Sequence, residues 1–379
     1  MDSTFIPYGR QQIDSDDIES VLTTLRSNWL TTGPMVEGFE AALALAAGVK
    51  HAVVVCNGTA ALHAAMHALD IGAGDEVIVP PMTFAATANA VLYQGGTPVF
   101  ADVEAETLLI DPKAVEARIT PRTKAIVAVD YAGQPCDYDA LRKLADRHNL
   151  RLVTDACHSL GCAWKDRPCG SQADLTVFSF HPVKPITTGE GGGIVTDDED
   201  LARRMRTFRN HGITSDHGQR AKSGSWHYEM VELGFNYRLT DLQCALGLTQ
   251  LNKLQRFIDS RRQLAALYDA AFARDAAIRP LGVRLEARHG YHLYVVRVAE
   301  RDRIFRHLRE AGIGANVHYI PVHYHPYYRQ RFGTGEGLCP IAEAAYAEIL
   351  SLPIFPGLTV EDQTRVIDTL REAVSLETS

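Results

Sequence analysis

The chain has 379 residues, of which 46% are hydrophobic and 22% charged, as in an ordinary globular protein with a large core. The formal net charge of −8 argues against a nucleic-acid partner. The sequence has no apolar run that could span a membrane, and its first residues lack a signal-peptide pattern. The 7 cysteines include no Cys-x-x-Cys pair, which favours a protein of the reducing cytoplasm.

Short apolar runs alternate with longer amphipathic segments from residue 51 onward. The runs lie at residues 51–55, 76–80, 98–101, 124–129, 151–154, 175–180 and 193–196. Several of them end at an acidic or small residue and lead into a helical pattern. This alternation predicts an α/β fold, in which βα units surround a mostly parallel sheet.

The pattern changes after residue 242, where a long helical stretch runs to about residue 273. A strand pattern at 292–298, a helical pattern at 302–312 and a C-terminal helical pattern at 359–374 follow. We therefore predict a large α/β domain over residues 1–245, and a connecting helix with a small α+β domain over residues 246–379. The polar, glycine-containing segment 212–224 is the predicted mobile surface loop.

Lys184 follows an apolar strand pattern and precedes a glycine-rich turn at residues 189–193. Because burial disfavours the ammonium form, a lysine packed at a strand end is more readily neutral and nucleophilic. Neutral lysines in pockets bind carbonyl compounds covalently, above all pyridoxal phosphate (PLP). A lysine in a surface turn would look the same in isolation, so this interpretation depends on the other motifs.

The turn Asn57-Gly58-Thr59-Ala60 lies between a predicted strand and a helix. A helix N-terminus offers free N–H groups and a positive dipole end, which together suit a phosphate group. Thr59 adds a hydroxyl, and the small Ala60 allows close approach. A capping turn without any ligand is equally compatible with these residues.

Asp155 ends another predicted strand, at the position where open α/β sheets bind ligands. PLP needs a carboxylate beside its ring nitrogen, because a protonated ring accepts electrons more readily. His158 could face the ring or its phenolic oxygen, or it could be a capping or core histidine. Ser179 could donate to the phosphate, and Phe84 could stack on the ring, although a lone aromatic residue is more often part of the core.

The combined blocks resemble the PLP-dependent sugar aminotransferases of the DegT/DnrJ/EryC1/StrS family, which have fold type I. The shared blocks occur in the same order between residues 8 and 353. They are residues 57–62, Thr83-Phe84 with Thr87, Asp155 with His158, Ser179 with Lys184, residues 190–192 and residues 226–241.

The resemblance implies a role for each matching residue. Lys184, Asp155 and His158 would be catalytic: the lysine would bind PLP covalently, the aspartate would pair with the ring nitrogen, and the histidine would contact the ring. The other implied cofactor contacts are Thr59, Ala60, Phe84, Ser179 and Asn236. Family members are homodimers with shared active sites, so Asn236 would reach the neighbouring subunit's cofactor.

Within the family, residues 179–192 are most similar to the branch that serves pseudaminic acid biosynthesis. Those enzymes transfer an amino group from L-glutamate to a UDP-linked 4-keto-6-deoxy-N-acetylhexosamine, giving UDP-4-amino-4,6-dideoxy-N-acetyl-β-L-altrosamine. The implied substrate contacts are Tyr8, Asn28, Trp29, Leu30, Thr31, Ala60, Ser179, Asn236, His318, Tyr319 and Ile320. Residues 28–29 and 323–326 are closer to the wider family, which leaves bacillosamine- or perosamine-type 4-keto sugars as alternatives.

Three further hypotheses agree less well with the sequence. Family members that dehydrate the sugar have histidine in place of the cofactor lysine, so Lys184 argues against that reaction. A non-catalytic binding protein would not need Lys184, Asp155 and the phosphate turn together. A metal site at His318, His323 and His325 is not predicted, since their spacing matches no zinc pattern.

Overall fold

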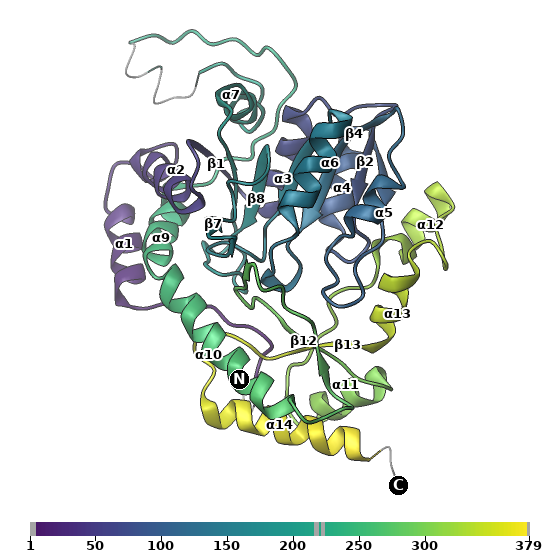
Figure 1. Cartoon of the computed structure of the whole chain (residues 1–379). Coiled ribbons are helices and arrows are strands. Elements are labelled where there is room, and N and C mark those ends of the chain that lie inside the picture. The colour runs from purple at the N-terminus through teal and green to yellow at the C-terminus, as the bar shows by residue number, and fades with distance from the viewer. Residues whose placement is uncertain (1–4, 216–219, 221–223, 377–379) are drawn as a thin grey trace.

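The computed structural model describes residues 5–215, 220 and 224–376 (Figure 1). Its central sheet consists of β1 (His51–Val55), β2 (Glu76–Val79), β3 (Thr97–Phe100), β4 (Thr123–Val129), β5 (Arg151–Asp155), β8 (Leu175–Ser179) and β9 (Gly192–Thr196). The order of these seven strands is β1-β9-β8-β5-β4-β2-β3. Neighbouring strands are parallel except at β9, which is antiparallel to β1 and β8. The predicted α/β fold with a mostly parallel sheet is confirmed.

Helices cover both faces of this sheet. They are α2 (Pro34–Ala47), α3 (Gly58–Ala68), α4 (Ala86–Tyr93), α5 (Pro112–Glu116), α6 (Tyr138–His148), α7 (Glu199–Phe208) and the 3-10 helix η1 (Tyr131–Gly133). Side chains along a strand point alternately to opposite faces. Accordingly, Val53 and Val55 of β1 pack in the core that contains α3, whereas Ala52 and Val54 pack in the core that contains α2.

The carboxyl ends of the parallel strands meet at one edge of the sheet, the usual place for a ligand in such folds. Asp155 ends β5 and Ser179 ends β8. At the same edge, Gly192 begins β9 and pairs with both Val55 and Ser179. A Cβ atom at position 192 would lie only 2.4 Å from the carbonyl oxygen of Asn57. Glycine at this position therefore allows the turn after β1 to lie directly against the sheet.

The C-terminal part of the chain has a separate core around a second sheet. Its elements are β10 (Arg279–Pro280), β12 (Tyr294–Arg297), β13 (Ile349–Leu352), α11 (Arg301–Glu310) and α14 (Val360–Ser375). Ile6, near the beginning of the chain, packs into this core and hydrogen-bonds through its N–H to the carbonyl of Gly312 at 2.9 Å. The predicted domain boundary between residues 245 and 246 stays a prediction.

The long helical stretch predicted from residue 242 is in fact two helices, α9 (Asp241–Asn252) and α10 (Leu254–Phe272). They meet at Lys253, whose ammonium forms an ion pair with the buried Asp17 of α1 (Ser15–Leu25) at 2.9 Å. The remaining elements are η2 (Val322–Tyr324), α12 (Pro326–Phe332), α13 (Pro340–Glu348) and a small sheet of β6 (Ala163–Trp164), β7 (Arg167–Pro168) and β11 (Ala287–Arg288).

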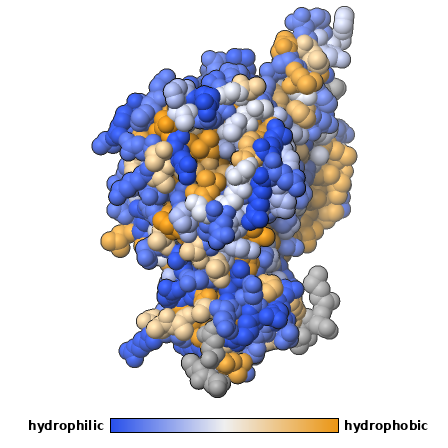
Figure 2. Space-filling view, turned by 90° about the vertical axis from the view of Figure 1, so that its right-hand side faces the viewer, coloured by the Kyte–Doolittle hydropathy of each residue, from blue (hydrophilic) through white to orange (hydrophobic). Residues whose placement is uncertain are grey.

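The surface narrows between the larger part of the molecule, which contains the central sheet, and the smaller C-terminal part (Figure 2). Hydrophilic side chains cover most of the face seen in this view. Within the described ranges, no helix is long and apolar enough to cross a membrane. In the surface loop predicted at 212–224, residues 216–219 and 221–223 lie outside the described residues.

Candidate active site

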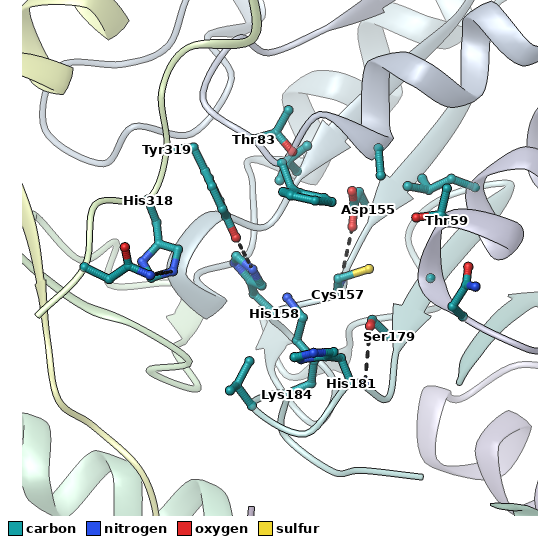
Figure 3. Close-up of a pocket in the computed structure, with 18 of the residues that line it drawn as sticks. Thr59, Thr83, Asp155, Cys157, His158, Ser179, His181, Lys184, His318 and Tyr319 are labelled. Atoms are coloured by element: carbon teal, nitrogen blue, oxygen red, sulfur yellow. Dashed lines mark hydrogen bonds between the residues drawn. The ribbon is translucent and has the colours of Figure 1, made fainter. Parts of the chain in front are cut away.

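A cavity of about 620 Å³ lies at the carboxyl edge of the central sheet (Figure 3). It collects side chains from segments that are far apart in the sequence. The predicted site residues in its wall are Tyr8, Thr59, Phe84, Asp155, His158, Ser179, Lys184, His318 and Tyr319. The three predicted catalytic residues therefore share one cavity.

Lys184 lies in the turn after β8, where its N–H donates to the carbonyl of His181 at 2.9 Å. Its amine points into the cavity, on the side of His158 and Cys157 (Figure 3). Desolvation lowers the pKa of Lys184 below its ordinary value, and the nearby Cys157 and Asp155 oppose this shift. Because burial favours the uncharged amine, this lysine is suited to nucleophilic attack on a carbonyl carbon.

The carboxylate of Asp155 is buried at the end of β5 and accepts two hydrogen bonds. The Thr87 hydroxyl donates to Oδ2 at 2.7 Å, and the N–H of Cys157 donates to Oδ1 at 3.2 Å. A buried carboxylate is costly unless it is paired or hydrogen-bonded. A protonated ring nitrogen placed in the cavity would supply the missing positive partner.

His158 lies between Lys184 and the wall formed by Tyr319. Its Nε2 atom is 3.1 Å from the Tyr319 hydroxyl, and its Nδ1 atom is buried without a partner among the described residues. Desolvation, together with the charges of Lys184 and His318, lowers the pKa of His158 well below its ordinary value. The ring is therefore neutral near pH 7 and can face an aromatic cofactor without adding charge.

The turn before α3 forms the wall opposite Tyr319. The Asn57 side chain caps the helix by accepting the N–H of Ala60 at 2.8 Å, while Gly58 and Thr59 line the cavity. Because a Cβ atom at Gly58 would lie 3.0 Å from the Cβ of Ser179, this turn packs closely against the end of β8. The turn and Ser179 thus offer the N–H groups and hydroxyls that a phosphate needs. Ala60 is buried and does not line the cavity.

Several predicted site residues lie outside this cavity. Residues 28–31 are exposed and run beside the start of α9, where Thr31 pairs with Thr240 and the N–H of Asp241 donates to the carbonyl of Leu30 at 3.0 Å. Asn236 is also exposed and pairs with Asn210, and the exposed Ile320 follows Tyr319 without entering the wall. Their roles stay predictions, because this chain does not bring them to its own cavity.

Some residues of the site had no role assigned from the sequence. Cys157 and His181 line the cavity. The ring centroid of His292 lies 4.2 Å from that of His158. The hydroxyls of Thr83 and Thr87 are hydrogen-bonded to each other, and Thr87 also donates to Asp155. Thr83 and Thr87 belong to one of the blocks shared with the family, but no role was assigned to them from that block. Nothing in the sequence indicates that this pair faces Asp155.

Comparison with known proteins supports the family resemblance found in the sequence. The sequence profile of the DegT/DnrJ/EryC1/StrS aminotransferase family matches residues 11–371. The spore coat polysaccharide biosynthesis protein SpsC of Bacillus subtilis is 43% identical over 378 residues, covering 98% of this chain and 97% of SpsC. Helicobacter pylori PseC, an aminotransferase involved in the biosynthesis of pseudaminic acid, has a TM-score of 0.92 and 34% identity, covering 98% of this chain and 100% of PseC.

A further solved structure bears on the cofactor. Spr1654 of Streptococcus pneumoniae in its PLP form has a TM-score of 0.92 and 33% identity, covering 98% of this chain and 99% of that protein. The cavity described above fits this cofactor, with a partly desolvated lysine, a buried carboxylate and a helix N-terminus in its wall. The cofactor is PLP and the fold is type I.

Replacing Lys184 by alanine should abolish turnover in a protein that still folds. General acid–base catalysis alone is typically worth about 10²–10⁴-fold, and the covalent link to PLP is lost as well. Visible absorbance spectra of the PLP-loaded protein and steady-state turnover test this prediction. Lys143→Ala on the exposed face of α6 serves as the control. Wild-type turnover by Lys184→Ala would remove the lysine from the mechanism.

Proposed function

Because the chain belongs to the DegT/DnrJ/EryC1/StrS aminotransferase family and is a PLP-dependent sugar aminotransferase, we propose that it aminates C4 of a UDP-linked 4-keto-6-deoxy-N-acetylhexosamine. L-Glutamate would be the amino donor, and UDP-4-amino-4,6-dideoxy-N-acetyl-β-L-altrosamine the product. The observation that carries the proposed chemistry is the convergence of Lys184, Asp155 and His158 in one cavity. The choice of sugar is supported by the similarity of residues 179–192 to that branch and by the relation to PseC.

PLP, when bound, supplies an aldehyde carbon and a ring that takes up electrons. We assign Lys184 to the covalent bond and, once released from it, to moving a proton at Cα of the donor or C4 of the sugar. Asp155 would hold the proton on the ring nitrogen, and His158 would contact the ring. Thr59, Ser179 and the N–H groups of the turn before α3 would hold the phosphate.

The wall formed by Tyr8, His318 and Tyr319 suits the uncharged part of a sugar. Desolvation lowers the pKa of His318 to about 3, so this ring is neutral near pH 7. Its Nδ1 atom is 2.9 Å from the Ser351 hydroxyl, and its ring lies 5.3 Å from that of Tyr8. Neutral hydrogen-bonding groups of this kind match ketone and hydroxyl groups. No arginine occurs among the described residues that line the cavity. We therefore expect the diphosphate of the nucleotide sugar to bind cationic side chains outside this wall.

We expect a homodimer in which each active site uses residues of both chains. Trp226 and Leu233, in the segment before Asn236, are 85% and 78% exposed, and large apolar side chains gathered on a surface commonly mark an interface. Asn236 and residues 28–31 lie outside this chain's own cavity, as expected if they serve the neighbouring one. We place the reaction in the cytoplasm, because the cysteines of the described residues are free thiols.

A second candidate is amination of another nucleotide-linked 4-keto sugar, of the bacillosamine or perosamine type. The observation that keeps this candidate open is that SpsC, at 43% identity, is named for spore coat polysaccharide biosynthesis and not for pseudaminic acid. Both candidates use the same residues around PLP and differ only in the sugar and nucleotide.

Incubating the PLP-loaded enzyme with L-glutamate and a panel of 4-keto-6-deoxy sugars tests the substrate. The panel contains UDP-, dTDP- and GDP-linked sugars, and mass spectrometry detects the amino sugar formed. We expect the highest kcat/KM for the UDP-linked 4-keto-6-deoxy-N-acetylhexosamine whose amination gives the altrosamine product. Preference for a GDP-linked sugar or for another stereoisomer would contradict the proposed substrate, while leaving the aminotransferase reaction intact.

Mixing two inactive variants tests the shared site. Under random pairing after subunit exchange, Lys184→Ala and Asn236→Ala should recover about a quarter of wild-type activity, because half of the dimers carry one intact site of two. The control mixture of Lys184→Ala with Asp155→Asn should recover nothing, since both of those residues come from one chain. No recovery in the first mixture, despite proven subunit exchange, would contradict a site shared between the two chains.

A further inference from the structure

Two buried threonines lie behind Asp155. Thr83 lies in the turn after β2 and Thr87 in the first turn of α4, and they are only 2% and 1% exposed. Their hydroxyl oxygens are 2.8 Å apart, and the Thr87 hydroxyl is 2.7 Å from Oδ2 of Asp155. The three side chains therefore form a continuous row of hydrogen bonds that reaches the carboxylate.

The direction of each hydrogen bond in this row follows from proton counting. A hydroxyl group has one proton to donate, and an ionised carboxylate can only accept. Thr87 must give its proton to Asp155, so the contact between the threonines requires Thr83 to donate to Thr87. Donors in such a chain polarise one another, which strengthens the last bond to the carboxylate.

We propose that Thr83 and Thr87 are positioning residues that orient Asp155 and stabilise its charged form for the ring nitrogen of PLP. This inference rests on the proposed role of Asp155. The Thr87 hydroxyl occupies one side of Oδ2, and the Cys157 N–H occupies one side of Oδ1. These two donors fix the plane of the carboxylate at the cavity. Hydrogen bonding to the charged form of a carboxylate favours that form.

The same row also holds the turn that carries Phe84. This residue lies between Thr83 and the first turn of α4, and the N–H of Thr87 donates to the Phe84 carbonyl at 3.2 Å. The Phe84 ring is exposed in the cavity, with its centroid 6.2 Å from that of the Tyr319 ring. The two threonine hydroxyls thus connect Asp155 with the turn that carries Phe84. Both of these residues are expected to contact the PLP ring, Asp155 at its nitrogen and Phe84 at its face.

The chain offers a closely matched control in Thr154, which precedes Asp155 on β5. Thr154 is 2% exposed, and its hydroxyl has no hydrogen-bond partner among the described residues. Thr154→Val therefore removes a buried hydroxyl from the residue that precedes Asp155 in the chain, without removing a hydrogen bond. A purely structural role of buried threonines would make Thr154→Val and Thr87→Val behave alike.

The test uses the holoenzyme loaded with PLP that carries nitrogen-15 in its ring, whose chemical shift reports the protonation of that nitrogen. We expect Thr87→Val to move this shift toward the unprotonated ring. It should also slow the half-reaction with L-glutamate about tenfold to a hundredfold, the factor that corresponds to one lost hydrogen bond to a charged group. Thr87→Ser should restore both values. Thr83→Val should have a smaller effect in the same direction, and no further effect when added to Thr87→Val. Thr154→Val should match the wild type.

Two results would contradict the proposed role of Thr83 and Thr87. One is a folded Thr87→Val holoenzyme with the wild-type nitrogen shift; the other is an equal shift in Thr154→Val. If Thr87→Val does not fold, Thr83→Val decides, and an unchanged nitrogen shift in that variant overturns the proposal. Asp155→Asn tests the role of the carboxylate separately, because an unchanged nitrogen shift in that variant means that Asp155 is not the partner of the ring nitrogen. The half-reaction needs no sugar, so the outcome does not depend on the proposed sugar substrate.

Discussion

The register of four neighbouring strands, β1, β9, β8 and β5, determines where the candidate site residues meet. Gly192 pairs with Val55 on one side and with Ser179 on the other, and Asp155 on β5 pairs with Val177 of β8. This register brings the turn before α3, the serine and the carboxylate to one edge of the sheet. A side chain at Gly192 would collide with the carbonyl of Asn57, so the arrangement depends on glycine there.

Burial then sets the charge state of the groups at this edge. Desolvation lowers the pKa values of both Lys184 and His158, which favours a neutral amine and a neutral imidazole. Asp155, by contrast, accepts one hydrogen bond at each carboxylate oxygen, from the Thr87 hydroxyl and from the Cys157 N–H. One cavity thus combines an amine whose uncharged form is favoured by burial with a carboxylate that is held by two hydrogen bonds.

Much of this site could be predicted because strand ends and glycine-rich turns are visible in the sequence. Lys184, Asp155 and the turn at Thr59 each follow an apolar run, and parallel strands bring such positions together. The hydrogen bond between Thr87 and Asp155 spans 68 positions, and no local pattern indicates that distant pairing. The break between α9 and α10 was missed for a similar reason, since it coincides with the long-range ion pair of Lys253 and Asp17. Residues 28–31 match the family motif, yet their distance from this chain's cavity follows only from the folded structure.

We propose that Lys184 is the amine that binds the cofactor covalently. The most direct test is to treat the PLP-loaded protein with borohydride, which makes the bond between a lysine and the aldehyde carbon of PLP permanent, and to map the labelled peptide by mass spectrometry. We expect one labelled lysine, Lys184, in the peptide that contains residues 179–192. A label on another lysine, or a protein that binds PLP without any labelled lysine, would contradict it.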